Sequence, residues 1–191
     1  MIRQFSIASL AFVLTAGTLV ASAQTRPPAV FIDRKICPGK GCQYTGRARA
    51  VDKIRVYRLP SLSAARSLTL PLGTMITGID SQVHTRAGRF RVKRNHGKYR
   101  LGEILSVYTY LGEGFFKIWH RGRGRMTEEG LAFSVWGGST GTRCDQDPKI
   151  CWGVLEKDTD MKWWLKIRTN NNRTGWILVD KNLNWLEPES T

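Results

Sequence analysis

A run of cationic side chains gives this sequence its clearest capacity for chemistry, which is the binding of anions. Residues 86–100 contain seven Lys and Arg residues and no Asp or Glu. Arg89, Arg91 and Lys93 share one face of a strand if the Phe and Val between them point inward, and arginine forks bind phosphate or carboxylate oxygens. A solvated strand face followed by a polar loop is the other interpretation. The candidate binding residues are Arg86, Arg89, Arg91, Lys93, Arg94, Lys98 and Arg100.

A second cationic segment and several tryptophans add candidate contacts. Arg121, Arg123 and Arg125 alternate with glycine, which fits either a cationic finger towards acidic polymers or a turn between strands. The adjacent Trp163 and Trp164 point to opposite faces if the chain is extended, so we expect one of them to face solvent or a groove. Trp163, Trp164 and Trp176 are therefore candidate binding residues, and core packing is the other role open to each.

Groups that could catalyse a reaction are scattered along the sequence. His84, His96 and His120 stand singly among basic or aromatic residues. Glu103 and Glu113 flank a central strand and could form the carboxylate pair of a glycosidase, but Glu113 is more simply a turn residue. We therefore predict a protein that is not an enzyme, with no catalytic residue and no cofactor. A small cell-wall hydrolase is the alternative from the enzyme class.

The first 23 residues predict export. Arg3 is followed by an apolar run from residue 7 to residue 20 and then by Ala21-Ser22-Ala23, which is the order of a secretory signal peptide cleaved before Gln24. The run is short for a membrane span, and no cysteine follows it to accept a lipid. We expect the mature protein to be periplasmic or secreted, and not membrane-spanning.

Export changes the interpretation of the four cysteines. Cys37 and Cys42 bracket four residues, and Cys144 and Cys151 bracket six. An even number of cysteines in an oxidising compartment favours disulfides, and we predict the local pairs 37–42 and 144–151 over the crossed connectivities. A four-cysteine zinc site is the alternative, but its paired ligands usually stand closer together than the second pair does. We predict no metal.

Composition and periodicity favour an all-β fold. The chain has 191 residues, of which 41% are apolar and 19 are glycine, enough for a core and many turns. Residues 102–121 predict a hairpin with a Gly-Glu-Gly turn, in which Leu105, Val107, Thr109 and Leu111 share one face. The formal charge of +15 favours an anionic partner such as a cell-wall polymer, lipid head groups or nucleic acid.

Several predicted strands resemble a known family. The segments are Ile54-Arg55-Val56-Tyr57, Pro60-Ser61, Gly73 before a β run, Phe90-Arg91-Val92, Trp164-Leu165-Lys166-Ile167 and Thr174-Gly175-Trp176-Ile177. Their order resembles the bacterial SH3-type (SH3b) domain of exported envelope proteins. The resemblance implies small, strongly bent antiparallel barrels that bind peptides or glycan strands in a shallow groove, without catalysis.

The sequence thus predicts an all-β protein with two small, antiparallel SH3-like barrel units in tandem, stabilised by disulfides. Residues 1–23 are the signal peptide, 24–50 an extended leader with the Cys37/Cys42 loop, 51–100 the first unit, and 101–187 the second unit with the Cys144/Cys151 loop. The predicted function is non-catalytic binding at the cell envelope, to peptidoglycan or an envelope protein, through a basic and aromatic surface. The alternative is an electrostatic binder of nucleic acid or lipid head groups. The oligomeric state stays open.

Overall fold

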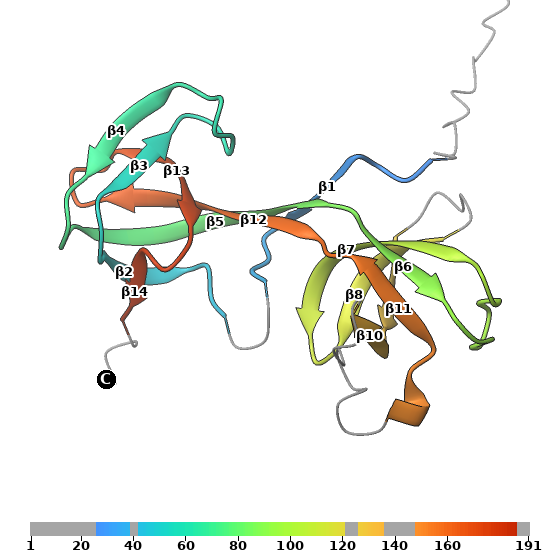
Figure 1. Cartoon of the computed structure of the whole chain (residues 1–191). Coiled ribbons are helices and arrows are strands. Elements are labelled where there is room, and N and C mark those ends of the chain that lie inside the picture. The colour runs from blue at the N-terminus through green and yellow to red at the C-terminus, as the bar shows by residue number, and fades with distance from the viewer. Residues whose placement is uncertain (1–25, 39–41, 121–125, 136–147, 187–191) are drawn as a thin grey trace, which may run out of the picture.

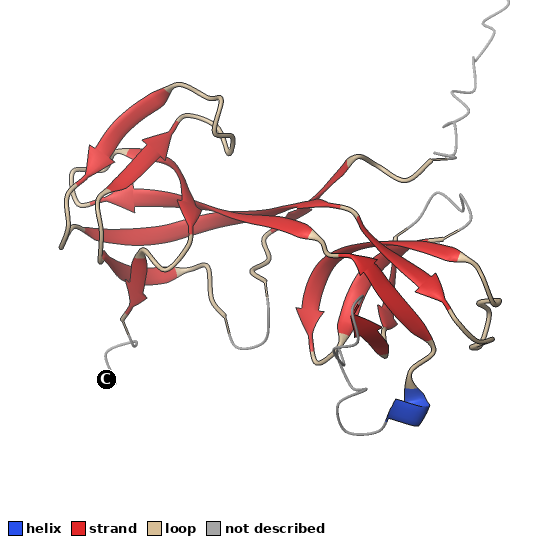
Figure 2. Cartoon of the chain, in the orientation of Figure 1, coloured by secondary structure: helices blue, strands red, loops and turns tan. Residues whose placement is uncertain are grey.

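The strands in the described part of the chain form two sheets, which Figure 1 shows as two lobes. The computed structural model describes residues 26–38, 42–120, 126–135 and 148–186. In this described part, the regular elements are strands and one turn of 3-10 helix, η1 (Pro148–Ile150), as Figure 2 shows. The all-β prediction is therefore confirmed.

Lobe A is the eight-stranded sheet, in the order β14-β2-β5-β12-β13-β3-β4, with β1 also paired to β5. Lobe B is the six-stranded sheet, in the order β10-β11-β6-β7-β8-β9. The strands of lobe A are β1 (Val30–Arg34), β2 (Gly46–Ala50), β3 (Ile54–Tyr57), β4 (Arg66–Leu70), β5 (Met75–Arg86), β12 (Asp160–Thr169), β13 (Thr174–Val179) and β14 (Leu183–Trp185). Those of lobe B are β6 (Gly88–Val92), β7 (Ile104–Gly112), β8 (Phe115–Trp119), β9 (Thr127–Gly130), β10 (Phe133–Val135) and β11 (Gly153–Lys157).

Lobe B is inserted into lobe A between β5 and β12. The chain passes from β5 into β6 through Ala87 and returns from β11 into β12, so the antiparallel pair β5–β12 continues as the pair β6–β11. Figure 1 shows this ribbon running between the lobes. At the crossing, a Cβ on Gly88 would lie 2.6 Å from the carbonyl oxygen of Lys157, so the close approach requires glycine.

The predicted boundary between residues 100 and 101 does not separate the two sheets. Strands β12 and β13, from the predicted second unit, pair with β5 and β3 of the predicted first unit. Alternation of apolar residues shows which face of a strand is buried, but it does not show which strand lies beside it. The insertion was therefore not visible in the sequence pattern.

The predicted leader, residues 24–50, also contributes two strands to lobe A. Both β1 and β2 pair antiparallel with β5. The buried side chains of β2 are Ala48 and Ala50, which are too small to give a strong apolar signal between arginines. The Cys37–Cys42 disulfide lies between these strands and confirms the predicted local pair. Cys151 is disulfide-bonded as well, and Cys144 of the second predicted pair lies outside the described residues.

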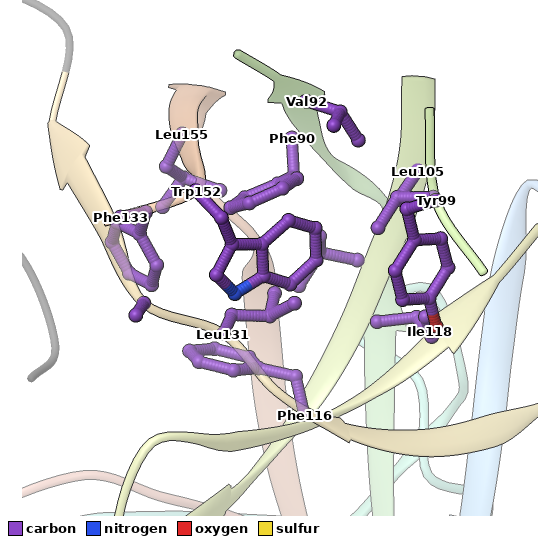
Figure 3. Close-up of a cluster of buried hydrophobic side chains, with 12 residues drawn as sticks. Phe90, Val92, Tyr99, Leu105, Phe116, Ile118, Leu131, Phe133, Trp152 and Leu155 are labelled. Carbon is purple, nitrogen blue, oxygen red and sulfur yellow. The ribbon is translucent and has the colours of Figure 1, made fainter. Parts of the chain in front are cut away.

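Each lobe has its own apolar core. The core of lobe B packs around Trp152, as Figure 3 shows, and Trp152 is 1% exposed. The main core of lobe A contains Ile54, Val56, Ile76, Leu165, Ile167 and Ile177. A smaller cluster of Tyr57, Trp164 and Trp176 is separate from it.

The central hairpin forms as β7 and β8, with one departure from the prediction. Its turn has positive φ angles at Gly112, Glu113 and Gly114, and Leu105 and Val107 lie in the core of lobe B. The register shifts between Val107 and Tyr110, and Thr109 then faces β1 and β5 instead of this core. The prediction that Thr109 shares the face of Leu105 is wrong because a β-bulge reverses the alternation.

Candidate functional site: a basic groove on lobe A

A groove of about 320 Å³ lies over strands β1, β5 and β12 of lobe A. The strand register aligns three cross-strand rows of side chains on one face, since alternate residues of a strand point the same way. These rows are Val30–Arg86–Asp160, Ile32–His84–Lys162 and Arg34–Gln82–Trp164. The loop between β3 and β4 lines the groove from the other side with Pro60, Ser61, Leu62 and Ser63.

The opposite face of the same three strands holds the groove in place against lobe B. Asp33 of β1 is 6% exposed, and its carboxylate accepts a 2.6 Å hydrogen bond from the hydroxyl of Thr109 and pairs with Lys117. The ring of Phe31 lies 5.8 Å from that of Tyr108. Strand β1, which forms one side of the groove, is thereby fixed to β7 and β8.

Cations dominate the charge of the groove. Arg86 of the groove lining is exposed, and so is Arg34 beyond the lining on the same face of the sheet. Lys162 lies 4.0 Å from the carboxylate of Asp160, with both side chains about half exposed. An exposed pair at this distance contributes little to stability, so its charges remain available to a ligand. Ser61 and Ser63, whose hydroxyls are 2.8 Å apart, add neutral hydrogen-bonding groups.

His84 lines the groove from β5, the middle one of the three strands. Its Nε2 is 2.9 Å from the amide oxygen of Gln82, and its ring is 6.4 Å from that of Trp164. Burial lowers the pKa of His84 below its usual value, and the charge of Arg34 lowers it further. At neutral pH the imidazole is therefore uncharged and can donate one hydrogen bond and accept another.

We expect this histidine to make stability depend on pH. Because its pKa is lower in the folded state than in the unfolded state, the unfolded state binds more protons as the pH falls through the usual histidine range. Stability from this group is present above that range and is lost on acidification. Thermal unfolding of wild type and His84→Gln between neutral and mildly acidic pH should show a smaller loss in the variant. An equal loss in both proteins would contradict the assignment.

The cationic run on β6 is partly neutralised by an acidic residue. Phe90 and Val92 are fully buried, so Arg89 and Arg91 point outward, as the alternation predicts. The carboxylate of Glu156 on β11 pairs with both arginines, at 3.0 Å from Arg89 Nε. Its hydrogen bond with Arg91 lowers the pKa of Glu156 and raises that of Arg91. Sequence analysis missed Glu156 because it is 65 residues away from Arg91.

Four further cations of the run lie in the loop after β6, and all of them are exposed. Lys98 is 3.4 Å from the carboxylate of Glu129, and Arg100 donates a 2.8 Å hydrogen bond to the carbonyl of Gly97. Lys93 and Arg94 complete this set. The loop cations belong to lobe B and lie outside the groove lining, which contains only Arg86 of the predicted run.

The predicted aromatic contacts are largely buried. Trp164 and Trp176 are 1% and 8% exposed, and Trp164 also lines the groove. Trp163 points to the other face of β12, where its Nε1 donates a 2.8 Å hydrogen bond to Ser81 and its ring stacks on Trp185. Arg121, Arg123 and Arg125 lie outside the described residues.

The candidate catalytic residues do not form one site: His84 is on lobe A, Glu113 is in the turn between β7 and β8, and the others lie near Tyr99 and Trp152 in lobe B. His120 is 2.8 Å from the carboxylate of Glu103. The sequence did not indicate this pairing because Glu103 precedes β7 and His120 follows β8, 17 residues later. His96 stacks on Trp152 in lobe B, and His84 lies in the groove. Within the described residues, no three or more His, Cys, Asp and Glu side chains gather in a way that could hold a metal ion.

The chain matches no protein-family model, curated protein or solved structure. The resemblance of its strands to SH3b domains therefore stays a prediction. In the described part of the chain, no helix is long and apolar enough to span a membrane.

Proposed function

We propose that this chain is an exported, non-catalytic binding protein of the bacterial cell envelope, and that its ligand site for peptidoglycan is the groove on lobe A. The observation that carries the proposal is the mixture of groups in the groove. Arg86 and Lys162 supply positive charge, Asp160 supplies negative charge, and two serine hydroxyls and His84 supply neutral hydrogen bonds. A concave site with a few such groups on rigid strands is typical of ligand binding.

The peptide stems of peptidoglycan fit this mixture chemically. They carry carboxylates and amides, together with amino groups in some stems, and so offer partners for both signs of charge. Val30 and Leu62 provide apolar contact at the groove. The SH3b-like strands and the signal-peptide pattern support the same location and ligand class.

The exposed cations of lobe B have a supporting role in this proposal. Lys93, Arg94, Lys98 and Arg100 attract an acidic polymer over a distance, which raises the rate of encounter. The same cations, with the formal charge of +15, favour a second candidate function, the binding of nucleic acid or lipid head groups by charge alone. Salt separates the two because charge-driven binding weakens steeply as salt rises.

The double variant Arg86→Ala/Lys162→Ala removes two charged hydrogen-bonding groups from the groove. We expect it to bind purified peptidoglycan about tenfold more weakly than the mature, oxidised wild-type protein does. The measurement is co-sedimentation from low to high salt, with duplex DNA as the anionic control. Wild-type protein should stay on peptidoglycan at high salt and leave the DNA.

The matched control is Arg94→Ala with Arg100→Ala, which removes the same charge from lobe B. This control should reduce binding at low salt and leave the salt-resistant fraction unchanged. Equal losses in the two double variants, or release from peptidoglycan and DNA at the same salt concentration, would assign the binding to charge and overturn the proposal.

A further inference from the structure

We infer that the outer edge of β1 binds an extended, acidic segment of a partner protein by adding a strand to lobe A. This interaction needs no ligand in the groove and goes beyond the proposed function. Among the described residues, β1 pairs with β5 alone. A strand with an unpaired edge presents N–H and C=O groups to which another strand can bind.

The main-chain groups of three residues point to this edge. Lys35 N donates a 2.8 Å hydrogen bond to Ser81 O, which continues the register of β1 and β5 by one residue. In an antiparallel pair, alternate residues direct their N–H and C=O groups towards the partner strand. Phe31 and Asp33 therefore bond to β5, and the groups of Val30, Ile32 and Arg34 point away from it.

The edge is rigid before any partner arrives. Asp33 and Phe31 anchor β1 through Thr109, Lys117 and Tyr108. A strand that is already held in an extended conformation loses little conformational entropy on binding. The described chain contains no proline or bulge between Val30 and Arg34, which are two of the devices that protect an edge.

Both ends of the edge are sharply defined. Pro27 and Pro28 precede it and have no N–H to donate. Lys35 follows it with a φ of 55°, which is a left-handed conformation that ends the strand. A partner strand can therefore pair with the five residues of β1 and with few others.

The side chains along the edge specify the chemistry of the partner. Val30 and Ile32 are 41% and 43% exposed and lie on one face. Arg34 and Lys35 are exposed at one end, Arg26 is exposed at the other, and the acidic Asp33 between them is buried against Lys117. The complementary strand has alternate apolar residues at its centre and acidic residues at its ends. A second copy of this chain is a poorer partner because each copy carries a large net positive charge, +15 for the full sequence.

The experiment measures binding of a fluorescent peptide, Glu-Thr-Val-Thr-Ile-Thr-Glu, to the mature protein by fluorescence anisotropy. Ile32→Pro removes one outward N–H and leaves the ladder with β5 intact, so we expect at least about tenfold weaker binding. Ile32→Thr keeps that N–H and should weaken binding by only about threefold. A peptide with Lys in place of Glu should bind wild type more weakly than the Glu peptide does. The same Lys peptide should bind the Arg34→Glu variant more tightly than it binds wild type.

The comparison of the Glu and Lys peptides on wild type and Arg34→Glu tests the inference even if Ile32→Pro fails to fold. Circular dichroism would show such a failure. Equal peptide binding by folded Ile32→Pro and Ile32→Thr would overturn strand addition. Equal binding of the Glu and Lys peptides by wild type would overturn the acidic partner. Self-association through β1 without peptide binding would also overturn it, in favour of a second copy. Lys162→Ala changes a groove residue on β12, two strands away from β1, and this variant should bind the peptide as wild type does. Peptide binding therefore tests the edge of β1 independently of the groove proposal.

Discussion

Replacing Asp33 with Ala should destabilise the protein by about 3 kcal/mol, because breaking a buried ion pair from one side leaves the other charge uncompensated. The side chains of Asp33 and Lys117 are 7% and 21% exposed. Without the carboxylate, the Lys117 ammonium keeps its contact with the ring of Phe31, 5.6 Å away, but loses its ion-pair partner. The measurement is urea unfolding of the oxidised protein followed by circular dichroism.

The loss extends beyond one ion pair because Asp33 ends a chain of hydrogen bonds. Thr109 donates its hydroxyl proton to Asp33, and Thr85 is 3.0 Å from the same Thr109 oxygen, so Thr85 must be the donor there. Asp33→Ala leaves the buried hydroxyl of Thr109 without its hydrogen-bond acceptor, which adds to the loss of stability. This series of hydrogen bonds joins β1, β5 and β7. Its loss should make β1, which forms one side of the groove, more mobile.

Two further variants make this expectation specific. Asp160→Asn changes an aspartate whose ion pair is about half exposed, and it should shift the unfolding free energy by less than about 0.5 kcal/mol. Adding Lys117→Met to Asp33→Ala should recover part of the loss, because the stranded charge is removed. A loss below about 1 kcal/mol for Asp33→Ala would mean that this carboxylate does not hold β1.

Replacing Trp152 with Ala should have the larger effect, a destabilisation of about 3 to 5 kcal/mol. Its indole is 1% exposed. It stacks on Tyr99 at 5.2 Å and on His96 at 4.6 Å, and it meets the edge of Phe90 at 4.5 Å. The cavity left by the indole would reach the ring of Phe90 on β6 and the ring of Tyr99 in the loop after β6, both of which Figure 3 shows beside Trp152.

The matched control is Trp163→Ala in lobe A, which removes the same side chain from a partly exposed position. This indole stacks mainly on Trp185 and bonds to Ser81, so its removal should cost less than half as much. The comparison is again made by urea unfolding. Similar losses for the two variants would show that the core of lobe B does not depend on Trp152 in the way that its packing indicates.

Local patterns in the sequence predicted the strands better than their partners. Residues 54–57 are β3 as predicted, and the Gly-Glu-Gly turn closes the hairpin of β7 and β8. These features depend on alternation and on glycine conformation, which act over a few residues. The role of Glu156 beside Arg91, and of Asp33 beside Thr109, depends on pairings across 65 and 76 residues. Such pairings leave no periodic signal.

The groove illustrates the same limit. Arg86 and Trp164 were candidate binding residues in the sequence, but nothing there indicated that they line one groove with Ser61 and Asp160. The burial of Trp164 and Trp176 follows from packing against Tyr57, which alternation alone does not decide. The sequence also overestimated the positive charge along β6, because the carboxylate that compensates it, Glu156, comes from β11.

The insertion of lobe B has a consequence for the order in which the protein is made. Lobe B is built from one continuous segment, whereas in lobe A β3 pairs with β13 and β2 with β14. The amino-terminal strands therefore reach the compartment in which the protein folds before their neighbours do, and the sheet cannot close until residue 185 has arrived there. During that interval β2 to β5 expose apolar side chains that belong to the core of lobe A, and such exposed surface favours aggregation until the last strands arrive.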